Sequence, residues 1–97
     1  MDIRFELNGD TFVWNPEKAI ENLVKHGVTF EEAATVFGDP FFKLADASRN
    51  DEARDAVIGF DVSGRLLFVV HIEIEDEHIR IISARRATSG EGLKYAE

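Results

Sequence analysis

A long segment of alternating apolar residues most constrains what this chain can fold into. Five large apolar side chains occupy every second position between Arg65 and Glu75. Side chains two residues apart lie on the same face of a strand, so the pattern predicts a long strand with one fully apolar face. The five residues are Leu66, Phe68, Val70, Ile72 and Ile74.

The remaining strands are shorter and are separated by turn residues. They are predicted at residues 3–7, 11–14, 41–45, 56–62 and 78–84. Asn8-Gly9 predicts a hairpin between the first two, because both residues tolerate positive φ. In the simplest register of the last two strands, Glu73 lies opposite Arg80. Ile72 then lies opposite Ile81, so the sequence predicts an antiparallel meander.

Two helices are predicted between the second and third strands. The first is capped by Asn15, starts at Pro16 and stops at Gly27, a residue suited to the left-handed conformation. Ile20, Leu23 and Val24 share one of its faces, at roughly 100° per residue. Lys18, Asn22 and Lys25 form a polar stripe on the opposite side. This stripe is either a solvated helix surface or an edge that faces phosphate.

The second helix begins with a capping box of Thr29 and Glu32 and ends at Gly38-Asp39-Pro40. Only Gly27 and Val28 separate the two helices, which predicts a tight helical hairpin. A short last helix is predicted from about residue 86 to 95, weakened by its glycines. We therefore expect one α+β domain over residues 1–97, with an N-terminal helical hairpin packed on an antiparallel sheet and a short C-terminal helix.

Composition excludes several classes of function. The chain has 97 residues and no cysteine, so neither a disulfide framework nor a cysteine-based zinc site is available. It begins without a charged and then apolar leader, and its longest apolar run is far below the roughly 20 residues of a membrane span. We expect a cytoplasmic protein without a membrane partner. Its net charge of −8 is unusual for a protein that binds nucleic acid.

Several blocks of residues form a specific pattern along the chain. The N-terminal blocks are Trp14-Asn15-Pro16-Glu17-Lys18, Lys25-His26-Gly27-Val28 and Val36-Phe37-Gly38-Asp39-Pro40. The C-terminal block is Arg80-Ile81-Ile82-Ser83-Ala84-Arg85-Arg86, with Glu91 and Tyr95 beyond it. The Lys-His-Gly-Val and Arg-Ile-Ile-Ser-Ala-Arg blocks together are far more specific than either alone. With these blocks, the chain resembles the BrnT toxin family over residues 12 to 97.

The resemblance implies a RelE-like fold and a metal-independent endoribonuclease that inhibits translation as the toxin of a type II toxin–antitoxin system. It implies an RNA substrate, no cofactor, and a ribbon-helix-helix antitoxin of the BrnA type. Operator DNA would be bound only through the complex with that antitoxin. The acidic charge and the glycines of the last helix favour an alternative, a weak or inactive homologue that serves as an antitoxin-binding module.

Metal-free RNA cleavage needs a base, an acid and cations around the phosphate. His26 is the best proton-transfer candidate, because an imidazole titrates nearest neutral pH. An alternative is that His26 only caps its helix. We assign Lys25, His26, Arg85 and Arg86 as catalytic candidates. The three histidines have no metal-binding spacing, so we expect no metal site.

The RNA-binding candidates are Lys18, Asn22, Arg54 and Arg80. Arginines can hold a phosphate by two hydrogen bonds, but in an acidic protein they can equally form surface ion pairs. For Arg80 we favour an ion pair with Glu73. Glu91 and Tyr95 share a helix face and are possible auxiliary groups, although helix-surface residues are the simpler interpretation.

Overall fold

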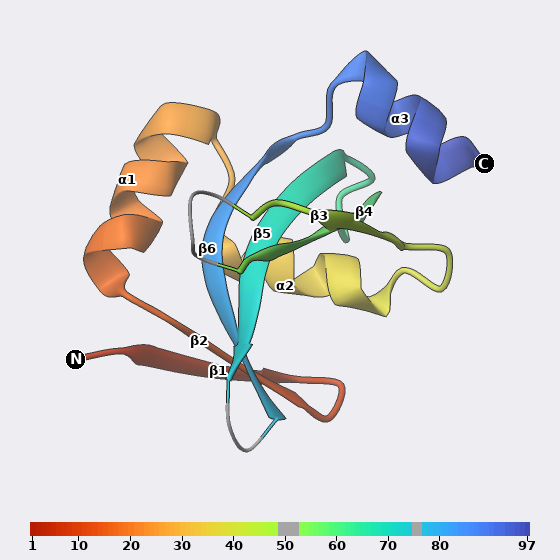
Figure 1. The fold of residues 1–97 in the computed structure, drawn as a ribbon. Coiled ribbons are helices and arrows are strands. Elements are labelled where there is room, and N and C mark those ends of the chain that lie inside the picture. The colour runs from red at the N-terminus through yellow and green to blue at the C-terminus, as the bar shows by residue number, and fades with distance from the viewer. Residues whose placement is uncertain (49–52, 75–76) are drawn as a thin grey trace.

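The computed structural model describes residues 1–48, 53–74 and 77–97 (Figure 1). A hairpin of two strands comes first, two short helical segments follow, and four strands and a last helix complete the chain. In order, the elements are β1 (Ile3–Leu7), β2 (Asp10–Trp14), α1 (Pro16–His26), α2 (Phe30–Thr35), the 3-10 turn η1 (Val36–Gly38), β3 (Lys43–Asp46), β4 (Asp55–Phe60), β5 (Leu66–Ile74), β6 (His78–Arg86) and α3 (Ser89–Ala96).

The strands form one six-stranded mixed sheet in the order β1-β2-β6-β5-β4-β3. In the described residues, neighbouring strands of the sheet are antiparallel except for β2 and β6, which are parallel. The predicted all-antiparallel sheet is therefore wrong. The N-terminal hairpin joins the sheet beside the last strand, and the long chain between β2 and β6 supplies the crossover that a parallel pair requires.

The predicted N-terminal helical hairpin is also wrong. Two strands precede α1, and α1 and α2 each pack against β6 instead of forming a packed helical pair. In Figure 1, α1 stands beside β6 while α2 lies across the sheet. A two-residue connection keeps the two helices near each other in space, but it does not make them pack together. Each helix packs on β6 instead. The expected RelE-like architecture, built on that hairpin, is replaced by the mixed sheet.

A β-bulge shifts the register between β5 and β6. Val70 lies opposite Ser83, but His71 lies opposite Ile81, so Ile82 is an extra residue in β6. The predicted pairing of Glu73 with Arg80 is wrong by one residue, because the bulge lies between the turn and the centre of the strands. Beyond the bulge the pairs follow the predicted register. Ile82 and Ser83 lie at this bulge, on the side of β6 that faces α1.

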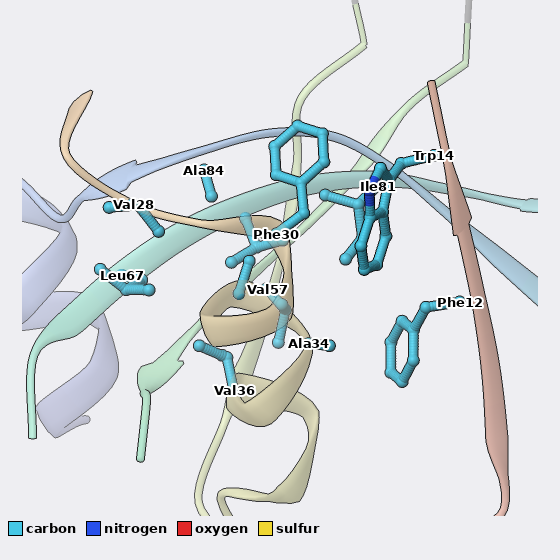
Figure 2. Packing of buried hydrophobic residues seen from close by; sticks show 12 residues of the cluster. Phe12, Trp14, Val28, Phe30, Ala34, Val36, Val57, Leu67, Ile81 and Ala84 are labelled. Carbon is cyan, nitrogen blue, oxygen red and sulfur yellow. The ribbon is translucent and has the colours of Figure 1, made fainter. Parts of the chain in front are cut away.

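The core lies on the face of β5 opposite the one with the apolar pattern. Leu67 and Val69 are fully buried, whereas Phe68 and Val70 are only partly buried and Ile74 is exposed. The reason is that α2 packs on the face of β5 that holds Leu67 and Val69. The buried cluster consists of Phe12, Trp14, Val28, Phe30, Ala33, Ala34, Val36, Val57, Leu67, Val69, Ile81 and Ala84. Figure 2 shows Phe12 and Trp14 of β2 directed toward α2.

The first helix is oriented opposite to its amphipathic pattern. Asn22, in the polar stripe, is buried, whereas Ile20, Leu23 and Val24 are 65%, 47% and 84% exposed. The polar side of α1 therefore faces the edge of β6, and its apolar side faces outward. This orientation places the polar stripe of α1 beside β6 and leaves an apolar surface exposed.

Candidate functional site

A buried amide fixes α1 against the free edge of β6. The side-chain nitrogen of Asn22 donates to the carbonyls of Val28 and Ala84, each at 2.9 Å. Its oxygen accepts from the backbone N–H of Ala84 at 3.0 Å. The parallel partner strand β2 ends its pairing at Arg80, so these bonds take the place of the next strand at the β6 edge. This contact, the α1–β6 seam, positions the polar stripe of the helix.

Caps at both ends hold the remaining residues of α1 in place. The side chain of Asn15 accepts from the backbone N–H groups of Glu17 and Lys18. Gly27 adopts φ 70°, and its N–H donates to the Leu23 carbonyl at 2.9 Å. The predicted caps are confirmed. Gly27 ends the helix, and the bonds from Asn22 to Ala84 hold its last turns beside β6.

A cavity of about 360 Å³ opens beside this seam. We call it the cationic pocket; it is lined by Lys18, Glu21, Asn22, Lys25, His26, Arg54, Ile82 and Ser83. Three cations, one carboxylate and one imidazole face it. In the described part of the chain, the ammonium groups of Lys18 and Lys25 form no ion pair. An acidic protein therefore carries a local excess of positive charge here, suited to an anion.

A second hollow of about 260 Å³ shares Lys18, Arg54 and Ile82 with the cationic pocket and adds Arg80. The guanidinium of Arg80 donates to Asp2, not to the predicted partner Glu73. This hydrogen bond raises the pKa of Arg80 and lowers that of Asp2. Asp2 therefore partly neutralises the positive charge that Arg80 brings to this second hollow.

The other four sequence candidates do not line the pocket. Arg85 makes two hydrogen bonds to the carboxylate of Glu91, at 2.8 and 3.0 Å, and lies over the ring of Phe68. The bond to Arg85 lowers the pKa of Glu91, and the same pair raises that of Arg85. Arg86 is exposed at the end of β6. The hydroxyl of Tyr95 donates to Asp39 at 2.7 Å, which raises the tyrosine pKa.

These contacts attach the last helix to the sheet. The helix starts at Ser89, later than predicted, because Thr88 and Glu91 form a capping box. Glu91 also accepts hydrogen bonds from the guanidinium of Arg85. The ring of Tyr95 packs edge-on against that of Phe60, with 5.2 Å between the ring centroids. Glu91 and Tyr95 therefore anchor the last helix to the sheet.

A second polar network joins the α1–α2 connection to the β4–β5 turn. Arg65 donates to the buried carboxylate of Asp61 and to the Gly27 carbonyl, and it pairs with Glu32 at 3.1 Å. Burial alone would raise the pKa of Asp61, but hydrogen bonds from Arg65 and Ser63 hold it below its usual value. This network lies outside the pocket and has a structural role.

Sequence reasoning missed three residues that line the pocket: Glu21, Ile82 and Ser83. Glu21 lies three residues after Lys18 and four before Lys25, so helical spacing could have identified it. Ile82 and Ser83 depend on the bulge, for which the sequence carries no recognisable signal. Within residues 1–48, 53–74 and 77–97, no three His, Asp or Glu side chains are grouped so that they could hold a metal ion. No helix in these ranges is long and apolar enough to cross a membrane.

Fold and pocket together define a small α+β protein with a cationic pocket between α1 and β6. A family model describes the particular class: the chain matches "Ribonuclease toxin, BrnT, of type II toxin-antitoxin system" over residues 14–91. Because the match spans most of the chain, this protein belongs to the BrnT family of ribonuclease toxins. Membership implies an antitoxin partner and an RNA substrate.

A solved structure shares the fold. The ribonuclease toxin BrnT of Brucella abortus superposes with a TM-score of 0.58 at 20% sequence identity. The alignment covers 78% of this chain and 94% of the Brucella protein. At this identity the likeness concerns the fold alone. A search of curated protein sequences returned no match.

Proposed function

We propose that this chain is a metal-independent endoribonuclease whose active site is the cationic pocket. The observation that carries the proposal is the convergence of Lys18, Lys25 and Arg54 with His26 and Glu21 around one cavity of about 360 Å³. Lys18, Lys25 and Arg54 offset the charge of the scissile phosphate. Their arrangement on a capped helix and at the start of β4 keeps them in place before RNA arrives.

Glu21 and His26 supply the two proton transfers. The Glu21 carboxylate takes the proton of the 2′-hydroxyl as that oxygen attacks phosphorus. His26 gives a proton to the 5′-oxygen as the bond between phosphorus and that oxygen breaks. The products are a 2′,3′-cyclic phosphate and a 5′-hydroxyl end. The pair thus supplies the acid and base that a metal-free cleavage requires.

The remaining sequence candidates take supporting parts in this proposal. Asn22 positions α1, because its side-chain amide is hydrogen-bonded to backbone groups of Val28 and Ala84. Arg85, held by Glu91, and Tyr95, held by Asp39, anchor the last helix. Arg80, in the adjoining hollow, and Arg86, exposed at the end of β6, contact RNA phosphates on either side of the cleaved bond. Arg85 and Tyr95 are assigned to anchoring because each already bonds a carboxylate, whereas Arg80 would exchange its bond to Asp2 for an RNA phosphate.

In the cell, RNA cleavage by this chain would inhibit translation in the cytoplasm. A ribbon-helix-helix antitoxin of the BrnA type would neutralise it, and operator DNA would be bound through that complex. The net charge of −8 supports one competing function, an antitoxin-binding module with little or no nuclease activity.

Cleavage of a labelled RNA in the presence of a chelator tests the proposal. We expect His26→Ala to lose about 10²- to 10⁴-fold in rate, the range for a removed acid–base group. Lys25→Ala should bind RNA more weakly, with a shallower salt dependence. The matched controls are His78→Ala and Lys94→Ala, neither of which lines the pocket. Equal activity of His26→Ala and parent would place the chemistry elsewhere, and a folded but inactive parent would favour the antitoxin-binding module.

A further inference from the structure

The outward face of α1 is the unexplained feature of this fold. Ile20, Leu23 and Val24 form an apolar stripe at helical spacing, and all three are substantially exposed. A helix of a water-soluble domain ordinarily turns such a stripe toward the core. Here the α1–β6 seam holds the polar side inward through Asn22, so the apolar stripe faces outward.

A shallow groove runs along this stripe. It has a volume of about 140 Å³ and is lined by Ala19, Ile20, Leu23, Thr29, Phe30 and Glu31. Its floor is largely apolar and lies between α1 and the start of α2. An apolar groove beside an exposed apolar helix face accommodates the apolar side chains of a partner helix or strand.

Acidic residues flank the apolar stripe and line the groove, and they limit what can bind there. Glu17 and Glu21 follow the apolar stripe around α1, and Glu31 lines the groove from α2. All three are exposed. A second copy of this chain would bring the same carboxylates face to face, in a protein that already carries a charge of −8. A partner with apolar side chains flanked by Lys or Arg complements both the groove and its border.

We infer that the antitoxin docks on this face of α1 with an apolar segment flanked by basic residues. This inference rests on the proposed function, because it assigns the surface to the partner that silences the pocket. The same helix lines both surfaces: Lys18, Glu21 and Lys25 face the pocket, and Ile20 lines the groove. The pocket and the groove share α1 but no lining residue, so an antitoxin that silences the pocket extends from the groove around the helix.

Calorimetric titration of this chain with its antitoxin tests the inference. Ile20→Ser/Val24→Ser should weaken binding at least about tenfold, as expected for central apolar contacts. The matched control is Leu44→Ser/Val62→Ser, whose residues are 64% and 80% exposed against 65% and 84%. It removes similar exposed apolar side chains on another surface and should bind within about twofold of the parent.

A charge variant provides a second readout. Glu17→Gln/Glu31→Gln should lower the affinity and flatten its dependence on salt, since a border of charges acts through screened attraction. The control Asp10→Asn/Glu73→Gln removes two exposed carboxylates elsewhere and should keep the parental salt dependence. Equal salt dependence in both variants would remove the electrostatic part of the argument and overturn the choice of a basic partner.

Three outcomes would overturn the docking surface. Full affinity of Ile20→Ser/Val24→Ser is the first, and stronger weakening by the Leu44/Val62 control is the second. The third is a dimer of the free chain in light scattering, abolished by Ile20→Ser/Val24→Ser while antitoxin affinity is unchanged. RNA cleavage by the free variant should equal that of the parent. An inactive parent would refute the proposed nuclease, yet the titration would still decide where the antitoxin docks.

Discussion

Replacing Asn22 by alanine tests whether the α1–β6 seam depends on one buried amide. The substitution removes three hydrogen bonds and leaves the Ala84 N–H and the carbonyls of Ala84 and Val28 without partners. Ala84 and Val28 are fully buried, so water cannot readily replace the lost bonds. Each buried group left without a partner costs about 1–3 kcal/mol, so the three together give a destabilisation of at least about 3 kcal/mol.

This loss is large against the roughly 5–15 kcal/mol of a typical domain. For a chain of this size it lowers the melting temperature by roughly 12 °C or more. Urea unfolding gives the free energy and thermal unfolding the midpoint. Lys18→Ala, on the same stripe but exposed, should stay within about 0.5 kcal/mol of the parent. Asn22→Asp keeps the acceptor for Ala84 but loses both donors, so it should be destabilised as well.

A loss below about 1 kcal/mol for Asn22→Ala, together with RNA binding as weak as that of Lys18→Ala, would refute this reasoning. The amide would then serve the ligand, as the sequence alone suggested, and another contact would hold the helix.

The remaining predictions concern backbone space and pH. Gly59→Ala places a Cβ 2.9 Å from Val36 and 3.2 Å from Phe42, so unfolding should show a loss of about 1–3 kcal/mol. Gly90→Ala, where the new Cβ in α3 meets only Thr88 Oγ1 at 4.0 Å, should instead stabilise by up to about 1 kcal/mol. Hydrogen bonds lower the pKa of Asp61 from 3.8, so its contribution is present above that pH and disappears as the pH falls further. The urea midpoint of the parent should therefore fall more steeply below about pH 4 than that of Asp61→Asn, and parallel curves would contradict this.

The sequence by itself determined most of the local elements and the family of the protein. Its caps and turns placed α1 and the N-terminal hairpin correctly, because Asn15, Gly27 and Asn8-Gly9 act on their nearest neighbours. The family blocks identified a ribonuclease toxin, as the match over residues 14–91 shows. The pocket residues of α1 were also within reach, since helical spacing alone places Lys18 and Lys25 on one side.

Tertiary structure alone decided which faces are buried and which strands are neighbours. The amphipathic pattern of α1 gives two faces. The face with Asn22 packs inward because Asn22 hydrogen-bonds the backbone groups of Ala84 at the free edge of β6. Likewise α2 covered the face of β5 with Leu67 and Val69, although the other face is more continuously apolar. Periodicity reports that two faces differ, whereas burial depends on what packs against each. Partners distant in sequence supply that packing, so the pocket and the exposed stripe of α1 follow only from the assembled fold.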